Sequence, residues 1–149
     1  MNFKNLHKFT STLHLLYVED DTNLRAGTVE ILENFFATVS VCTNGQTGLE
    51  KYKKFFNESG KYFDIVITDI NMPVMNGIDM SEQIIHLNQK QSIFVISAHN
   101  EPHYLTKLIN IGIDKFLTNL YKQSNYSKLC IKNQKIFIMR NSLMNIIIS

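Results

Sequence analysis

The stretch TDINMPVMNG, residues 68–77, decides how this chain is interpreted, because an apolar segment ends there in an aspartate. The apolar residues 65–67 lie directly before Asp69, which places that aspartate at the tip of a buried strand. The Asn, Pro and Gly residues that follow form turns and start helices rather than continue a strand. Taken alone, the stretch also fits an aspartate that only caps a helix. The surrounding sequence favours a functional role.

Short apolar segments alternate with segments of helical periodicity on either side of this stretch. Strands are predicted at 13–18, 38–42, 62–68, 92–97 and 114–118, and helices at 22–36, from Asn44, at 77–87 and from Pro102 to Gly112. Such alternation indicates a parallel sheet with helices on both faces, and continuously apolar strands fit burial on both sides. The predicted fold is therefore α/β, with a five-stranded parallel sheet.

The length and composition of the chain are those of one ordinary soluble domain. The chain has 149 residues, of which 44% are hydrophobic, enough for a sizeable core. Cys42 and Cys130 are too few for a disulfide framework, and we expect free thiols in a reducing compartment. No segment has the length of a membrane-spanning helix, and acidic residues interrupt the N-terminus before a signal peptide could form. A cytoplasmic protein is expected.

The net charge of +2 conceals an uneven distribution. Up to Asp114 there are nine Lys and Arg against thirteen Asp and Glu, whereas from Lys115 onward there are six basic residues and no acidic one. A basic segment of this kind can bind nucleic acid, with strongly salt-dependent affinity. No recognition motif accompanies the basic residues, so nucleic-acid binding by this chain alone is the weaker interpretation.

Polar side chains follow the strands of the predicted sheet at the point where each strand ends. Glu19 and Asp20 follow the first strand, Asp69 ends the third, and Ser97 ends the fourth. The carboxyl ends of parallel strands meet at one edge, where such sheets bind ligands. Three crowded carboxylates repel one another unless a cation is bound, and Mg²⁺ prefers oxygen ligands of this type. An aspartate beside such a cation can accept a phosphoryl group as an acyl phosphate.

Each of these residues also has a structural explanation without chemistry. An acidic pair at a strand end commonly caps a helix, a single serine such as Ser97 is most often structural, and His99 is typical of an exposed loop. Their coincidence at consecutive strand tips favours function.

Four segments together resemble the receiver domain of two-component response regulators, the CheY-like family. They are LLYVEDD, DIVITDINMPVMNG, FVISAHN and GIDKFLT, and the resemblance spans about residues 13–118. The D-x-x-M-P-x-x-x-G pattern that starts at Asp69 is its most specific part. The resemblance implies a flavodoxin-like fold and a magnesium-dependent (or manganese-dependent) phosphoprotein that signals rather than catalyses turnover. Its phosphoryl donor would be a sensor histidine kinase.

The resemblance also assigns roles to individual residues. Asp69 would accept the phosphoryl group, Asp20 would bind the metal directly and Glu19 through water. Asn71 would add its backbone carbonyl to the metal site. Ser97 would contact the phosphoryl group on activation. The remaining assignments are to Phe116, the aromatic that moves with Ser97, and to Asn71 and His99, which vary the lifetime of the acyl phosphate.

The end of the predicted fifth strand departs from the family. The family has Lys-Pro there, whereas this chain has Asn119 and Leu120, and asparagine cannot supply the charge-assisted contact of an ammonium. Lys115 is too far back along the strand to replace it. We expect residues 1–12 to be an extension, 13–121 the receiver domain, and 122–149 a basic, apolar tail in place of a regular fifth helix.

One hypothesis for this departure is a one-nucleotide shift of the coding frame at Asn119. An added A there permits Lys-Pro followed by a more amphipathic helix. On this hypothesis, a parent protein that continued into an output domain is one option.

Three further interpretations stay open from the sequence. A pseudo-receiver that binds partners without switching is the alternative favoured by Asn119. A phosphatase of the haloacid dehalogenase type is disfavoured, because its D-x-D spacing after the first strand is absent. A homodimer through the face formed by 102–112, 114–118 and the following helix is a further option for the receiver.

Overall fold

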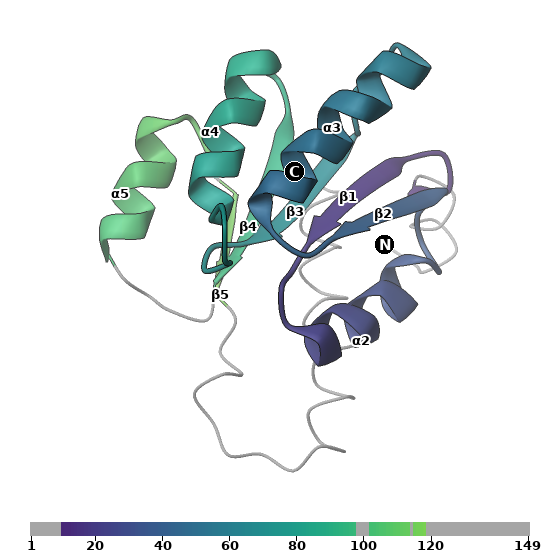
Figure 1. Ribbon diagram of the computed structural model, residues 1–149, viewed down its shortest axis with the longest axis horizontal. Helices are drawn as coiled ribbons and strands as arrows, with labels where there is room; N and C mark the ends of the chain where they lie inside the picture. The colour runs from purple at the N-terminus through teal and green to yellow at the C-terminus, as the bar shows by residue number, and fades with distance from the viewer. Residues whose placement is uncertain (1–9, 98–101, 114, 119–149) are drawn as a thin grey trace.

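The computed structural model describes residues 10–97, 102–113 and 115–118, which form a sheet with helices on both faces (Figure 1). In chain order the elements are β1 (His14–Val18), α2 (Thr22–Leu32), β2 (Thr38–Cys42), α3 (Gly45–Ser59), β3 (Ile65–Asp69), α4 (Gly77–Leu87), β4 (Ser92–Ser97), α5 (Pro102–Asn110) and β5 (Phe116–Thr118). The predicted alternation of strands and helices is confirmed. The predicted atypical fifth helix lies outside the described residues.

All neighbouring strands of the sheet are parallel, in the order β2-β1-β3-β4-β5. The register pairs Val18 with Thr68 and Asp69 with Ile96. The carboxyl ends of β1, β3 and β4 therefore lie at the same edge of the sheet. We call this the carboxyl edge, and the opposite edge, where the strands begin, the amino edge.

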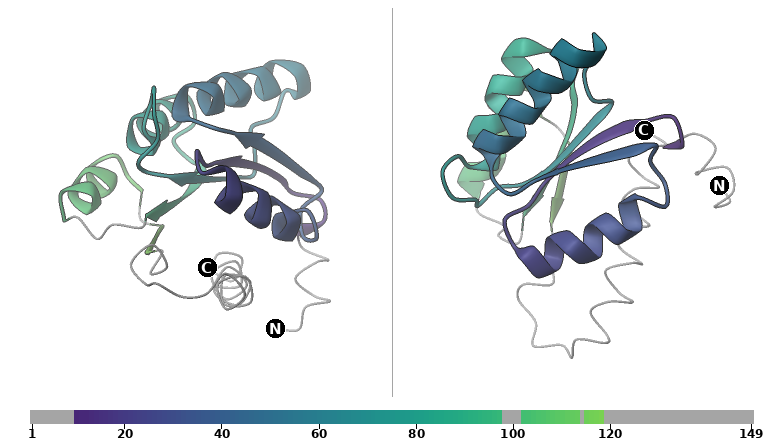
Figure 2. Two further views of the ribbon diagram at one scale, coloured as in Figure 1. Left: turned by 60° about the horizontal axis from the view of Figure 1, so that its bottom comes forward. Right: turned by 45° about the vertical axis from the view of Figure 1, so that its right-hand side comes forward.

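The two faces of the sheet are covered by different helices. α3, α4 and α5 lie on one face and α2 on the other (Figure 2). Alternate residues of a strand point to opposite faces, so Leu16 and Val18 join the core under α3 and α4, whereas Leu15 and Tyr17 join the core with Leu32 of α2. Two-sided burial explains the continuous hydrophobic segments within β1 and β3, at 15–18 and 65–67.

Side-chain caps fix where the helices start. Asp21 accepts a hydrogen bond from the amide of Leu24 at the start of α2, and Asn44 and Asn76 do the same for α3 and α4. Gly60, which ends α3, has a φ of 71°, a left-handed conformation that glycine adopts without steric cost. The loops at both edges of the sheet are therefore defined by local hydrogen bonds.

Two predicted boundaries were wrong by three or more residues, and the strand expected at 114–118 begins at Phe116. The strand expected at 62–68 is β3 at Ile65–Asp69, because the rings of Tyr62 and Phe63 stack on α3 instead of extending the sheet. The helix expected at 22–36 ends at Leu32, whose carbonyl accepts bonds from the amides of Phe35 and Phe36 as the chain turns. The aromatic residues of both segments pack in the core, which explains their apolar character.

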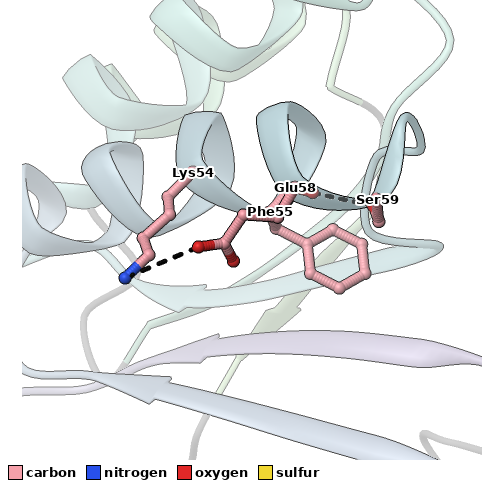
Figure 3. Close-up of polar contacts among 4 residues, drawn as sticks. All are labelled: Lys54, Phe55, Glu58 and Ser59. Atoms are coloured by element: carbon pink, nitrogen blue, oxygen red, sulfur yellow. Dashed lines mark hydrogen bonds and ion pairs between the residues drawn. The ribbon is translucent and has the colours of Figure 1, made fainter.

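The last turns of α3 lie over the amino edge and carry simple local contacts (Figure 3). Lys54 Nζ lies 3.7 Å from Glu58 Oε1 on the exposed face, and Ser59 Oγ donates a 2.7 Å hydrogen bond to the Phe55 carbonyl. The Phe55 ring stacks on Phe63, with 4.1 Å between ring centroids. Within the described part of the chain, no helix is both long and apolar enough to cross a membrane.

Candidate functional site

Three acidic side chains meet at the carboxyl edge. Glu19 and Asp20 directly follow β1, and Asp69 is the last residue of β3. One carboxylate oxygen from each lies within 4.8 Å of the other two. Glu19 and Asp69 are only 4% and 7% exposed, whereas Asp20 is exposed to solvent. The predicted convergence of these residues is observed, and two of its three members are largely removed from water.

The turn after β1 is held by backbone and side-chain hydrogen bonds. The Glu19 amide donates to the Cys42 carbonyl at 3.1 Å, and the Asp21 amide donates to Glu19 Oε1 at 3.1 Å. Arg25 of α2 donates from Nη1 to the carbonyls of Glu19 and Asp20, at 2.8 and 2.9 Å. The guanidinium therefore holds the backbone of the turn that carries both acidic residues, and the Asp21 amide bonds to the Glu19 carboxylate in the same turn.

Arg25 was not identified from the sequence. The available signal was its position near the start of α2, six residues after Glu19. A long side chain in the first turn of a helix that follows a strand can reach back to the end of that strand.

The start of α4 packs against the backbone of Asp69. The Gly77 amide donates to the Ile70 carbonyl at 2.9 Å, and Thr68 Oγ1 donates to the Asp69 carbonyl at 2.9 Å. A Cβ on Gly77 would lie 1.9 Å from the Asp69 carbonyl oxygen, so only glycine fits there. α4 is capped by Asn76, and α2 by Asp21. Helix capping therefore does not account for Asp69, Asp20 or Glu19.

The loop between β3 and α4 is constrained at its centre. Val74 has a φ of 68°, a left-handed conformation that costs a β-branched residue of order 1–3 kcal/mol. The Met75 carbonyl accepts a 2.9 Å hydrogen bond from the Gly45 amide, and a Cβ on Gly45 would lie 2.6 Å from that same oxygen. Contact with α3 thus fixes the loop that begins immediately after Asp69.

The charges of the site extend to a buried tyrosine of β1. Burial raises the pKa of Tyr17 well above its ordinary value, and the carboxylates of Glu19 and Asp69 raise it further. A hydrogen bond with Thr28 and the charge of Arg25 act in the opposite direction. Tyr17 is therefore neutral in the folded protein, so it adds no negative charge to the acidic cluster.

The structure describes only some of the other residues that were predicted for the site. Ser97 ends β4, one residue beyond the partner of Asp69, and Phe116 begins β5, where it packs on the core. Asn71 follows Asp69 by two residues, and its side chain bonds to Tyr104 of α5. His99 and Asn119 lie outside the described residues.

Lys115 is directed away from the carboxyl edge. Its Nζ donates to Ser92 Oγ at 3.0 Å and lies 4.9 Å from the centre of the Phe94 ring. Ser92 is the first residue of β4, so this cation lies toward the amino edge. The expectation that Lys115 does not take the place of the missing lysine agrees with this contact.

The acidic cluster has the chemistry of a magnesium site. Mg²⁺ binds hard oxygen ligands at about 2.0–2.1 Å in an octahedron, so its ligand atoms stand roughly 3–4 Å apart. The three carboxylates, within 4.8 Å of one another, need only a small closure to share one ion. A divalent cation would also offset the repulsion among three neighbouring negative charges.

Comparison with known proteins agrees with the geometry of this edge. Residues 15–131 match the family model of the response regulator receiver domain. The chemotaxis protein CheY of Thermotoga maritima is 30% identical over 111 residues, which cover 74% of this chain and 88% of that protein. The response regulator ARR12 of Arabidopsis thaliana is 27% identical over 116 residues, 78% of this chain. The chain spans only 19% of ARR12 and of the related ARR10.

Solved structures show the same fold. The N-terminal domain of an uncharacterized Wolinella succinogenes protein is 30% identical, with a TM-score of 0.62 over 88% of this chain and 98% of that one. The receiver domain of the Arabidopsis histidine kinase CKI1, solved with Mg²⁺ and BeF₃⁻, has a TM-score of 0.69 at 22% identity, over 89% and 94% of the two chains. The chain belongs to the response regulator receiver domain family, with the flavodoxin-like fold that was predicted.

Proposed function

We propose that this receiver domain accepts a phosphoryl group on Asp69 from a phosphohistidine of a sensor kinase and then signals through protein partners. The observation that carries the proposal is the meeting of Glu19, Asp20 and Asp69 at one edge, where capping does not explain them. Membership of the receiver family supports the same function.

Asp69 is the group that reacts. One of its carboxylate oxygens attacks phosphorus, the phosphorus–nitrogen bond of the phosphohistidine breaks, and the imidazole keeps the electron pair and later takes a proton from solvent. Gly77 and Thr68 hold the Asp69 backbone, so the carboxylate is positioned before the donor arrives. The product is an acyl phosphate on Asp69.

Glu19, Asp20, Asp69 and the carbonyl of Asn71 would hold Mg²⁺, or Mn²⁺ in its place. The cation supplies charge neutralisation for the transferred oxygens. Arg25 keeps the turn that carries Glu19 and Asp20 in place through its two carbonyl contacts. The related CKI1 receiver was solved with Mg²⁺ and a BeF₃⁻ group, which supports this choice of metal.

Ser97 and Phe116 are proposed to relay phosphorylation to partners, Ser97 by contact with the phosphoryl oxygens and Phe116 by moving inward with it. His99 and Asn71 are proposed to set the lifetime of the acyl phosphate. The activity beyond phosphoryl acceptance is limited to self-phosphorylation from small donors and loss of the phosphoryl group. The homodimer through the face around α5 and β5 stays a prediction.

A pseudo-receiver is the second candidate, because Asn119 stands where the family has lysine. In that case the chain binds partners without switching. The frame-shift hypothesis bears on the same residue: a gene whose Asn119 codon cannot yield Lys-Pro after a one-base insertion contradicts it. A phosphorylated protein with unchanged partner binding or oligomeric state would favour the pseudo-receiver.

The test uses two aspartates at opposite ends of β3: Asp69 is its last residue, and Asp64 directly precedes its first. The protein is incubated with Mg²⁺ and acetyl phosphate, and its intact mass is recorded beside Asp69→Asn and Asp64→Asn variants. Asp64 is exposed at the amino edge, so its variant is a matched control. We expect wild type and Asp64→Asn to gain one phosphoryl group only with Mg²⁺, and Asp69→Asn to gain none. Labelling that persists in Asp69→Asn contradicts the proposal.

A further inference from the structure

Tyr104 connects α5 to the loop that follows Asp69. Its hydroxyl lies 3.1 Å from Oδ1 of Asn71, across 33 residues of sequence. The Tyr104 ring is half-buried and packs against the core under α4 and α5, whereas Asn71 is exposed. Tyr104 is therefore the anchored partner, and its hydroxyl holds the side chain of Asn71.

The contact fixes one end of the Asn71 amide. Asn71 is two residues from Asp69, and the loop behind it is tied to Gly45 through Met75. With its backbone constrained, the main freedom left to Asn71 is rotation of its side chain. A hydrogen bond from a phenol to Oδ1 selects the rotamer that faces α5.

We infer that Tyr104 is a positioning residue that holds the Asn71 side chain toward α5 and thereby lengthens the lifetime of the acyl phosphate on Asp69. The inference rests on the proposed function. An amide both donates and accepts hydrogen bonds, so a released Asn71 side chain can orient a water molecule near the phosphoryl group. In hydrolysis the water oxygen attacks phosphorus, the bond from phosphorus to Asp69 breaks, and inorganic phosphate leaves with the aspartate regenerated.

Tyr104→Phe removes the hydroxyl and keeps the ring in its packing position. The protein is labelled with acetyl phosphate and Mg²⁺, the donor is removed, and the half-life of the acyl phosphate is followed by intact mass. We expect the half-life to shorten about fivefold, which corresponds to about 1 kcal/mol. Tyr62→Phe is the control, because the Tyr62 hydroxyl bonds to the Leu87 carbonyl at the amino edge. Its half-life should equal that of the wild type.

A second background distinguishes positioning from a general structural effect. In Asn71→Ala, the substitution Tyr104→Phe should leave the half-life unchanged, because its effect acts through the Asn71 amide. Equal shortening in both backgrounds, or no shortening in the wild type, overturns the inference.

The contact is also testable without phosphorylation. In ¹⁵N NMR spectra of the unphosphorylated protein, the side-chain amide signal of Asn71 should shift in Tyr104→Phe and stay in place in Tyr62→Phe. An unshifted signal overturns the contact. Absence of labelling in every variant overturns the proposed function and the lifetime inference together, whereas normal labelling with unchanged half-lives overturns the inference alone.

Discussion

The two edges of the sheet use polar residues in opposite ways. At the amino edge, Tyr52 Oη donates a 2.6 Å hydrogen bond to Gln91 Oε1, which also accepts from Asn88. Gln91 in turn donates to the carbonyls of Asp64 and Ser92. These groups are uncharged and bond to one another. At the carboxyl edge, three carboxylates are placed together, and Arg25 and Thr68 bond to the backbone that carries them.

This difference separates residues that stabilise the fold from residues that act. Buried polar groups that bond to one another contribute to stability and gain nothing from a ligand. Like charges brought within 4.8 Å of one another oppose folding until a cation is bound. Substitutions of the buried polar side chains at the amino edge should therefore change stability and leave labelling intact, whereas substitutions of the three carboxylates at the carboxyl edge should affect metal binding and labelling.

The largest effect on stability is expected where the carboxyl edge touches α4. Gly77→Ala puts a methyl group 1.9 Å from the Asp69 carbonyl oxygen, so α4 or β3 must move. We expect the free energy of unfolding to fall by about 3 kcal/mol, measured by urea denaturation. The control is Gly27→Ala in the exposed middle of α2, where nothing lies within 4 Å. That variant should be about 0.5–1 kcal/mol more stable. Similar values for both variants contradict the account.

Magnesium should stabilise the protein through the carboxyl edge alone. At a Mg²⁺ concentration of 100 times Kd, a single site adds about 2.7 kcal/mol to the free energy of unfolding. Asp20→Asn should lose this gain while being no less stable than the wild type without metal, because it removes one of three repelling charges. Asp64→Asn, at the amino edge, should keep the gain. A Mg²⁺-dependent rise in Tm that survives in Asp20→Asn would contradict the site.

At the amino edge, a substitution should lower stability without changing labelling. Tyr52→Phe removes a buried hydrogen bond of 2.6 Å and leaves Gln91 Oε1 with the longer bond from Asn88, which should lower the free energy of unfolding by about 1–2 kcal/mol. Labelling by acetyl phosphate should proceed at the wild-type rate, since no group of the carboxyl edge has changed. A stable Tyr52→Phe protein that fails to label would show that the two edges are not independent.

The same tyrosine makes stability depend on pH at the alkaline end. Burial raises the pKa of Tyr52 to about 12 in the folded protein, from an ordinary value of 10. The folded state therefore holds the proton more tightly, so the stabilisation is complete below about pH 10 and is lost as the pH rises toward 12. Tyr52→Phe should flatten the decline of unfolding free energy in this window. An equal slope in both proteins would contradict the assignment.

The smallest effect is expected on the outer face of α3. Lys54 and Glu58 form an exposed pair at 3.7 Å, and such pairs contribute roughly 0–0.5 kcal/mol. Lys54→Gln should change neither the unfolding free energy beyond that range nor the extent of labelling. A larger loss of stability would mean that this end of α3 contributes more than its contacts indicate.

The sequence correctly predicted the features that are fixed by where the strands end. Once the apolar segments before Glu19 and Asp69 were assigned to parallel strands, the meeting of their carboxylates followed from topology alone. The bounds of one helix were equally local: α5 begins at Pro102 as predicted, and it ends at Asn110, just before the predicted Gly112, which has a φ of 85°.

The sequence did not predict what depends on packing between distant segments. Tyr62 and Phe63 have the composition of a strand, but their rings cover α3, a contact that periodicity does not report. Tyr104 was missed for a similar reason, because its partner is a loop amide that comes near only when α5 packs on the sheet. Arg25 was missed although its partners, the carbonyls of Glu19 and Asp20, are close to it in sequence.

The most direct test of the central claim is to locate the phosphoryl group. The protein labelled with acetyl phosphate and Mg²⁺ is reduced with borohydride, which converts an aspartyl phosphate to homoserine, and its peptides are sequenced by mass spectrometry. The account predicts homoserine at position 69 and nowhere else, and none when Mg²⁺ is removed by chelation. Homoserine at Asp20 or at an amino-edge residue such as Asp64, or none at all under conditions that label an ordinary receiver domain, would contradict it.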